Sequence, residues 1–335
     1  MTDNTRTDDQ PSVSIIIVNY NGRKFIKECF DSLKRLNYSN YEILFVDNAS
    51  SDNSLTIVRQ NYPLVKVIEN HENLGFAAAN NIAAQKAEGE YLFLLNNDTK
   101  VDPDVLIELI KVISKDPTIG ICACTLMSYD GKQYFHTGIG CDLFGYPIVS
   151  KQVFYSEGSA LMIRRSLFQS VGGFDPEYFM FHEDIDLAWR IQLLNYKVMP
   201  VPEAVVYHLY GGSAGGESKD NKYLTTLFRR YYSERGNIRT LLKNYSFKTL
   251  MLILPLYLLI NIGEILIYSF TLNFNVIPCY IKAYYWNIIK INNLLIERKK
   301  IQQMRRISDK DIMKRMHKGS GKFRVFKKTG IPSFK

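Results

Sequence analysis

The stretch from Val13 to Gly22, VSIIIVNYNG, decides the fold prediction. Its first six residues are an almost continuous apolar run, which is typical of a strand buried on both faces of a parallel sheet. Apolar residues then recur at helical spacing from Phe25 to Leu36, which predicts a helix directly after the strand. Because a strand followed by a helix is the repeating unit of α/β proteins, we expect a mostly parallel sheet with helices on both faces.

The same alternation continues along the chain. It predicts further strands at Tyr41–Val46, Val65–Ile68 and Tyr91–Leu95, and helices at Asp52–Asn61, Gly75–Ala87 and Asp102–Lys115. We expect Ser50 or Ser51 to cap the second helix, and Pro103 to lie in the first turn of the last. The second half predicts strands at Ser156–Ile163, Lys197–Val201 and Ala204–His208, helices at Ser166–Val171 and Glu183–Leu194, and a glycine-rich candidate lid at Gly211–Gly216.

Short polar side chains follow each of the first four predicted strands. The four sets are Asn19, Tyr20 and Asn21; Asp47, Asn48 and Ala49; Asn70 to Asn73; and Asn96, Asn97 and Asp98. Ligands of open α/β sheets bind just beyond the carboxyl ends of the strands. Four polar sets in register therefore predict one common pocket.

Three residues near these strand ends have both a structural and a chemical interpretation. Asp98 is either a turn former or a hard oxygen ligand for a divalent ion that bridges two phosphates. Asp47 either forms an Asx-turn or accepts a hydrogen bond from a nucleotide base. His208, which ends a predicted strand, is either structural or a neutral ligand for an ion of the Mn²⁺ type or a phosphate.

The segment FHEDIDLAWR, residues 181–190, places three acids within four residues at a predicted helix start. Compensation of the helix dipole and an i,i+4 ion pair explain Asp186 and Arg190. They explain less well why aromatic and apolar residues surround Glu183 and Asp184. A carboxylate beside aromatic surface can have its pKa raised, as a general base requires.

Charge and cysteine content exclude several classes of protein. From Lys282 to Lys335 the chain has 16 basic and 3 acidic residues, and the remainder has 26 basic and 30 acidic. This is an acidic body with a basic tail, which favours an anionic surface as the partner over nucleic acid. Five cysteines without paired spacing support neither a disulfide framework nor a zinc site. The sequence has no Gly-x-Gly-x-x-Gly after the first strand and no Walker A motif, which argues against dehydrogenases and P-loop enzymes.

Two apolar stretches precede the basic tail. Thr249–Leu272 is long enough to span a bilayer, but Glu264 is costly there, and Val276–Ile296 contains Lys282 and Lys290. Basic residues flank the pair on both sides, which predicts that both ends stay cytoplasmic. Three arrangements fit: a hairpin in or on the inner leaflet, which we favour, a double span, or a soluble dimerisation hairpin.

Six motifs in this order resemble the family 2 glycosyltransferases, and within them the rhamnosyltransferase-type branch. The motifs are VSIIIVNYNG (13–22), VDNASSD (46–52), ENLGFA (72–77), LLNNDT (94–99), GGFDP (172–176) and HEDIDL (182–187). The continuation RRYYSERGNIR (229–239) resembles membrane-associated members of this branch. The resemblance covers residues 12 to 213 and implies a GT-A fold, a nucleoside-diphosphate sugar donor and an inverting reaction.

The resemblance also assigns roles to individual residues. Asp98 falls on the ligand of a divalent metal (Mn²⁺ or Mg²⁺), His208 on a second ligand in some members, and Asp184 on the catalytic base, with Glu183 beside it. With the strand-end residues, the expected donor-binding set is Asn19, Tyr20, Asn21, Asp47, Asn48, Asn73, Gly75, Phe76, Asn80 and Asn97. Many relatives have a second Asp at the position of Asn97. The asparagine keeps an oxygen acceptor but lacks the negative charge.

We therefore expect an inverting, metal-dependent transferase at the cytoplasmic face of the membrane. It would move a sugar to a hydroxyl of a cell-surface glycan or a polyprenyl-linked glycan precursor. The first choice for the donor is dTDP-rhamnose, which supplies rhamnose. The expected parts are a disordered arm (1–11), a GT-A domain (12–215), a helical linker (216–248), a membrane-associated hairpin (249–296) and a basic tail (297–335). The alternative is an inactive membrane-bound scaffold that binds sugar nucleotides; a nucleic-acid binder or a sugar-nucleotide synthase fits the sequence poorly.

Overall fold

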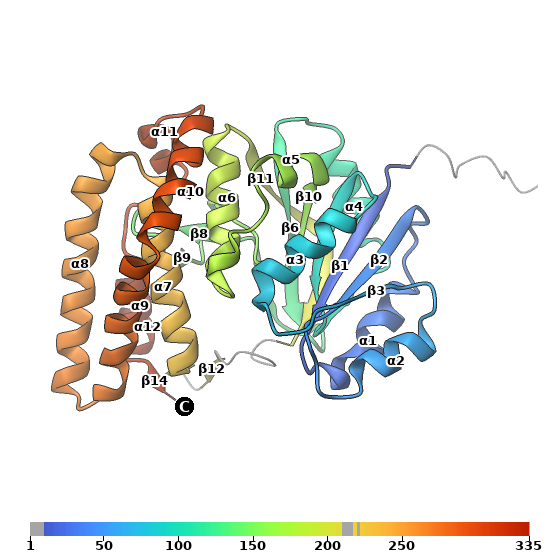
Figure 1. Ribbon diagram of the computed structural model, residues 1–335, viewed down its shortest axis with the longest axis horizontal. Helices are drawn as coiled ribbons and strands as arrows, with labels where there is room; N and C mark the ends of the chain where they lie inside the picture. The colour runs from blue at the N-terminus through green and yellow to red at the C-terminus, as the bar shows by residue number, and fades with distance from the viewer. Residues whose placement is uncertain (1–9, 210–216, 220–221, 335) are drawn as a thin grey trace, which may run out of the picture. The chain divides into compact units, whose positions relative to one another are not determined.

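The computed structural model describes residues 10–209, 217–219 and 222–334 (Figure 1). The chain divides into two compact units. The first contains Met1–Gly138, Ser156–Phe179 and Lys197–Leu209, and the second contains Ile139–Tyr155, Met180–Tyr196 and Tyr210–Lys335. The expected boundaries at 12–215, 216–248 and 249–296 stay a prediction, and the second unit also takes up two earlier segments of the chain.

The first unit is built on a sheet that has nine strands within the described residues, in the order β3-β2-β1-β4-β10-β6-β11-β5, with β7 against β6. Its strands are β1 (Val13–Asn19), β2 (Tyr41–Asp47), β3 (Lys66–Glu69), β4 (Tyr91–Asn96), β5 (Thr99–Val101), β6 (Ile119–Ser128), β7 (Tyr134–Thr137), β10 (Ala160–Arg164) and β11 (Lys197–His208). The helices are α1 (Arg23–Leu33), α2 (Ser54–Asn61), α3 (Gly75–Lys86), α4 (Val105–Ile113) and α5 (Arg165–Ser170), and η1 (Pro176–Tyr178) is a 3-10 turn.

The predicted α/β class is confirmed, but the sheet is mixed. β1 to β4 are parallel, as their apolar runs predicted, and Ile15, Phe45 and Phe93 are fully buried between the layers. β10 then inserts antiparallel between β4 and β6, and β11 runs parallel to β6 but antiparallel to β5. Strand direction in this half depends on pairing between distant segments, which local periodicity does not report.

Three local predictions for this unit are wrong. α2 begins at Ser54 after Asn53, and the backbone N–H of Ser54 is bound by Asp52 Oδ1 (3.0 Å), so neither Ser50 nor Ser51 caps the helix. α4 begins at Val105, after Pro103. The two strands expected between 197 and 208 are one strand, β11, whose register against β6 shifts between Val201 and Val205. A shift of this kind lets one strand look like two in the sequence.

The second unit is mainly helical. It contains β8 (Gly140–Cys141), β9 (Pro147–Ile148), α6 (Glu183–Leu193), β12 (Glu217–Lys219), β13 (Lys222–Thr225), α7 (Leu227–Asn244), α8 (Phe247–Phe270), η2 (Phe274–Val276), α9 (Ile277–Ile289), α10 (Ile291–Met304), α11 (Asp309–Lys314), α12 (Gly321–Thr329) and β14 (Ser333–Phe334). Its core includes Trp189 of α6, whose ring lies edge-on to Phe154 (5.6 Å) and Tyr245 (4.8 Å). The candidate lid at 211–216 lies outside the described residues.

The two apolar stretches are helical, and the expected membrane-associated hairpin stays a prediction. In the part of the chain that the structure describes, α8 is the one helix long and apolar enough to cross a membrane. The second stretch breaks at Lys290 into α9 and α10. The basic tail is ordered into α11 and α12, so part of its charge is used inside the fold: Lys322 forms ion pairs with Glu234 and Glu264.

Candidate active site

The predicted site residues fall into two sets, one in each compact unit. Register alone brings the first set together, because Asn19 of β1 is paired with Asp47 of β2. The amide nitrogen of Asn19 donates to Asp47 Oδ1 (3.3 Å) and to the hydroxyls of Ser50 (3.1 Å) and Ser54 (2.8 Å). Asp47 Oδ2 accepts from the Ser50 backbone N–H (3.1 Å), so Asp47 does form a turn at the strand end.

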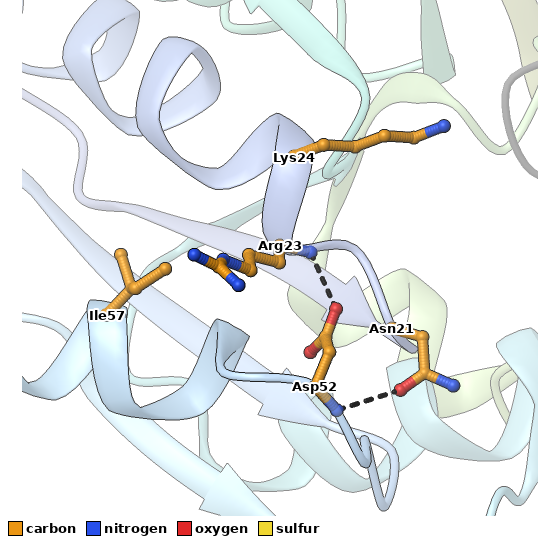
Figure 2. Close-up of a pocket in the computed structure, with 5 residues that line it drawn as sticks. All are labelled: Asn21, Arg23, Lys24, Asp52 and Ile57. Atoms are coloured by element: carbon orange, nitrogen blue, oxygen red, sulfur yellow. Dashed lines mark hydrogen bonds between the residues drawn. The ribbon is translucent and has the colours of Figure 1, made fainter.

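Asn21 closes the turn on the other side of β1. It lies in the left-handed region (φ 51°), and its Oδ1 accepts from the backbone N–H groups of Ser51 (2.8 Å) and Asp52 (3.3 Å). A pocket of about 320 Å³ lies here, lined by Asn21, Arg23, Lys24, Asp52 and Ile57 (Figure 2). Figure 2 shows Asp52 held between Asn21 and the Arg23 backbone. Tyr20, half-exposed beside them, is available for a ligand.

Asn48 organises the loop that follows β3. Its Nδ2 donates to Asn73 Oδ1 (2.8 Å) and to the Gly75 carbonyl (3.2 Å), while its Oδ1 accepts from Asn70 Nδ2 (3.0 Å) and the Leu74 N–H (3.1 Å). Asn73 Oδ1 also accepts from the Gly75 N–H (3.0 Å). Both ends of the Asn48 amide are thus used to shape the loop, and a role of Asn48 in donor binding stays a prediction.

Gly75 is required where the first turn of α3 meets the chain after η1. Its φ is +80°, and a Cβ there would lie 2.4 Å from the Phe179 carbonyl oxygen. That carbonyl accepts from the N–H groups of Phe76 (2.6 Å) and Ala77 (3.3 Å) and so caps the helix. The motif ENLGFA therefore contacts the segment that lies between the motifs GGFDP and HEDIDL. Asn80 is buried and its Nδ2 donates to the Phe76 carbonyl (2.9 Å), which indicates a structural role.

Asn97 is fixed by Asn19 and Gly22. Its Nδ2 donates to Asn19 Oδ1 at 2.6 Å. A Cβ on Gly22 would lie 2.1 Å from that same Nδ2, so a larger residue here would require the side chains of Asn97 and Asn19 to move. Gly22 was not among the predicted site residues, although it is the glycine that ends the motif VSIIIVNYNG.

Asp98 and His208 form a buried pair at the end of the sheet. His208 Nε2 lies 3.2 Å from Asp98 Oδ1, and the residues are 9% and 2% exposed. Antiparallel pairing of β11 with β5, which aligns His208 with Thr99, creates the pair. Burial alone would lower the pKa of His208, but the Asp98 carboxylate raises it above its ordinary value.

This pair fits a divalent cation. Oδ1 of Asp98 is buried and receives no hydrogen bond of good geometry from the described residues. A carboxylate oxygen and an imidazole nitrogen are both acceptable ligands for Mn²⁺. No group of three or more His, Cys, Asp or Glu side chains is arranged for a metal ion anywhere in the described ranges. Two protein ligands are nevertheless sufficient for an ion that also takes oxygens from a bound diphosphate.

The second set lies at the start of α6. Glu183 is 6% exposed, and burial, followed by the neighbouring Asp184 carboxylate, raises its pKa well above its ordinary value. Oε2 of Glu183 is buried and has no hydrogen-bond partner among the described residues. Asp184 is more accessible, and its Oδ1 accepts from the Ile185 N–H (2.8 Å). The expected rise in pKa beside aromatic surface is thus found at Glu183.

Asp186 fastens the second set to α7. It is fully buried and forms the predicted ion pair with Arg190 Nε (2.8 Å). It also contacts Lys243 Nζ (3.1 Å) and Asn244 Nδ2 (3.0 Å). Lys243 and Asn244 were not predicted to contact Asp186. They lie 57 and 58 positions after it in the chain, and no local sequence pattern links residues so far apart.

Residues 14–186, about half of the chain, match the model of the family described as glycosyl transferase family 2. This chain belongs to that family. The resemblance drawn from six motifs is therefore confirmed, and the protein is a glycosyltransferase.

A named relative of this family 2 glycosyltransferase supports the rhamnosyltransferase-like branch. The N-acetylglucosaminyl-diphospho-decaprenol L-rhamnosyltransferase of Mycobacterium tuberculosis is 26% identical over 236 residues, which are 60% of this chain and 77% of that protein.

Solved structures confirm the GT-A-type fold of the transferase. GalNAc-T7 with UDP, GalNAc and Mn²⁺ superposes with a TM-score of 0.59 at 20% identity, covering 72% of this chain and 49% of that one. The mannosyltransferase PcManGT of Pyrobaculum calidifontis, in complex with GDP-Man and Mn²⁺, gives a TM-score of 0.54 at 18% identity and covers 87% and 86%.

Proposed function

We propose that this family 2 glycosyltransferase transfers a sugar from a nucleoside-diphosphate donor to a hydroxyl of a polyprenyl-linked or cell-surface glycan, with inversion at the anomeric carbon. The donor proposed first is dTDP-rhamnose. The observation that carries the donor side is the buried Asp98–His208 pair, 3.2 Å apart, at the end of a sheet whose other strand ends carry Asn19, Asp47 and Asn48. The acceptor and the sugar rest on the relative's name, which is that of a decaprenol-linked rhamnosyltransferase.

Two groups must act on opposite faces of the anomeric carbon. On the donor side, Asp98 and His208 would hold Mn²⁺ or Mg²⁺, which neutralises charge on the departing diphosphate. On the acceptor side, Asp184 takes the proton of the attacking hydroxyl as the new C–O bond forms. The bond from the anomeric carbon to the diphosphate oxygen breaks, and the diphosphate leaves with the electron pair. That Asp98 and Asp184 flank one sugar is part of this proposal.

Glu183 has a supporting role in the proposal. Since its pKa is raised, it is protonated over a wider pH range than an ordinary glutamate, and it can donate a hydrogen bond to the acceptor or to Asp184. Asn19, Asn21 and Asp47 form a hydrogen-bonded frame around the position proposed for the nucleoside, with Tyr20 beside it. Asn73, Gly75, Phe76 and Asn97 would line the ribose and diphosphate.

The proposed place of action is the cytoplasmic face of the membrane, with an anionic membrane surface as partner. A polyprenyl-linked acceptor keeps its sugar at the leaflet surface, and the apolar α8 with its flanking cations suits that location.

A donor screen tests the proposal. Membranes that contain the full chain are incubated with a lipid-linked glycan acceptor and a panel of nucleotide sugars, with Mn²⁺ or with chelator. We expect transfer from one donor, lost with chelator and in Asp98→Ala. Donor binding without transfer to any acceptor would instead identify a sugar-nucleotide-binding scaffold, and the proposed reaction would be wrong.

A further inference from the structure

The polarity of α8 is reversed relative to a helix on a water-soluble surface. Its buried stripe begins with Leu250 and Ile253 and continues with Tyr257, Asn261 and Tyr268, and the side chain of Glu264 is only 18% exposed. Its exposed side is apolar and includes Met251, Leu252, Leu256, Leu258, Leu259, Ile262, Leu266 and Phe270. A surface helix in water turns its apolar stripe inward. α8 therefore has the arrangement expected of a helix whose outer side faces hydrocarbon.

The next two helices also expose apolar side chains. α9 and α10 expose Ile281, Tyr285, Ile288, Ile289, Ile291, Leu295 and Ile296. We call the exposed apolar residues of α8, α9 and α10 the apolar face. Many large apolar side chains exposed on neighbouring segments of the chain mark a binding site for a protein or a membrane.

Four charged residues hold the buried side of α8, and we call them the ionic core: Arg230, Glu234, Glu264 and Lys322. Lys322 Nζ contacts Glu264 (2.6 Å) and Glu234 (2.7 Å), and Arg230 contacts the same two acids at 3.1 Å each. Burial alone would raise the pKa of Glu264, but Lys322 and Arg230 hold it at about 2. The cost foreseen for Glu264 is thus met by ion pairs with α7 and α12.

The ionic core argues against a spanning helix. α8 has 24 residues and is about 36 Å long, enough for a hydrocarbon core of roughly 30 Å. Its buried side, however, is tied to Arg230 and Glu234 of α7 and to Lys322 of α12, so immersing α8 on all sides would carry these charges into hydrocarbon. α9, with 13 residues, is about 20 Å long and too short to span by itself.

Cations on the same elements favour an anionic lipid surface as the occupant of the apolar face. The exposed ones are Lys248 of α8, Lys282 of α9, Lys299 and Lys300 of α10, and Arg324, Lys327 and Lys328 of α12. A helix with an apolar side and flanking lysines binds in the plane of the interface, with its cations at the head groups.

We propose that the apolar face is a one-sided membrane anchor, in which α8 lies in the plane of an anionic bilayer and does not cross it. The inference deepens the proposed function, since it names the surface at which the acceptor would be met. Vesicle binding is measured without turnover, so the anchor can fail while the transferase stands, or stand while the transferase fails.

Vesicle flotation tests the occupant. The full chain is mixed with vesicles of phosphatidylcholine alone or with phosphatidylglycerol, and compared with the triple variant Leu252→Ser, Leu259→Ser, Ile262→Ser. We expect at least tenfold weaker partitioning for the triple variant and stronger binding to the anionic vesicles. The control is Leu64→Ser, a still more exposed leucine of the first unit (95%), which should bind like the parent.

Two results would overturn this assignment. One is equal vesicle binding by the parent and the triple variant. The other is a parent that sediments as a dimer without binding vesicles and becomes monomeric in the triple variant, which would make the apolar face an interface between two copies. Circular dichroism and donor binding are measured on the triple variant to establish that it remains folded.

Labelling of the helix ends tests the orientation. Cysteines are placed at Lys248 or Thr271, which are exposed at the two ends of α8 and lie outside the apolar face, while the five native cysteines are buried. Protein is added to preformed vesicles and treated from outside with a membrane-impermeant maleimide. We expect both ends to react to the same extent. Reaction of one end, with the other reached only after detergent, would show a spanning α8 and contradict the in-plane anchor.

Discussion

At the residue scale, the two acids of the proposed reaction, Asp98 and Asp184, lie in different environments. Asp98 is buried beside an imidazole, while Asp184 is more accessible at the start of a helix. The first suits a metal ligand, and the second suits a base that must reach an acceptor hydroxyl.

Asp184→Asn should therefore lower turnover and spare donor binding. A general base contributes typically 10²–10⁴-fold, so we expect kcat to fall by about that factor, with little change in the affinity for the nucleotide sugar. Turnover and calorimetric donor titration measure the two effects separately. The matched control is Asp130→Asn, an exposed acid of the first unit, which should leave both unchanged. Full activity of Asp184→Asn with a verified acceptor would remove the base assignment.

Gly75 permits a prediction that separates two costs of a side chain. Gly75→Ala meets both a positive φ (+80°) and a Cβ 2.4 Å from the Phe179 carbonyl, whereas Gly172→Ala meets a similar φ (+81°) with nothing within 4 Å. We expect a loss of about 1 kcal/mol in the free energy of unfolding for Gly172→Ala, and a larger loss for Gly75→Ala together with weaker donor binding. Denaturant unfolding and donor titration provide the comparison. Equal losses would mean that the contact with Phe179 is unimportant.

At the scale of elements, the sequence predicted what is locally encoded. The runs at β1, β2 and β4 are mostly apolar, and each predicted strand ends within one residue of the observed one. No strand was predicted at β6, because its Gly, Ala and Cys residues give no clear strand period. The antiparallel insertion of β10 was beyond reach, since no local pattern specifies a partner.

The candidate site shows the same division. Strand ends predicted that Asn19, Asp47 and Asp98 lie on one edge, but not that the Asn48 amide is hydrogen-bonded to Asn73 and Gly75 of the loop after β3. The anchoring of α6 by Lys243 and Asn244 depends on packing between helices far apart in the chain, and only the structure supplies it.

That anchoring predicts a strong coupling between α6 and α7. Lys243→Met leaves Asp186 buried with one cation fewer, and removing one partner of a buried pair costs about 3–5 kcal/mol in the free energy of unfolding. The double variant Asp186→Asn, Lys243→Met should recover part of that loss. A double-mutant cycle measures the coupling, and additive losses would show that the contact has no energetic weight.

At the scale of the whole molecule, buried acids determine how stability depends on pH. Asp142 is fully buried next to β8, where its Oδ1 accepts from the N–H groups of Phe144 (2.9 Å) and Tyr146 (2.8 Å). Its Oδ2 accepts from Gly321 N (2.6 Å) and so holds the start of α12. Burial raises the pKa of Asp142 to about 6, while the backbone donors oppose the rise.

The sign of the effect follows from this rise. Between the unfolded value of 3.8 and about 6, the folded state binds more protons than the unfolded state, so the free energy of unfolding falls as pH rises through this window. The full change is on the order of 3 kcal/mol for a shift of this size. Asp142→Asn should remove the dependence, at the cost of the bond to Gly321. Urea unfolding from pH 4.5 to 7.5 measures it, with Trp189 and Trp286 as probes in the same unit.

Asp309 provides a control with the opposite sign. Burial would raise its pKa, but hydrogen bonds from Arg305 and Ser246 outweigh burial and lower it. Its contribution to stability is therefore present above the unfolded pKa and is lost as pH falls through the lower, folded value. Asp309→Asn should reduce stability at neutral pH, with a deficit that shrinks as the solution is acidified, whereas the gain from Asp142→Asn grows toward neutral pH. If both variants changed the pH profile in the same direction, the opposing roles assigned to the two carboxylates would be wrong.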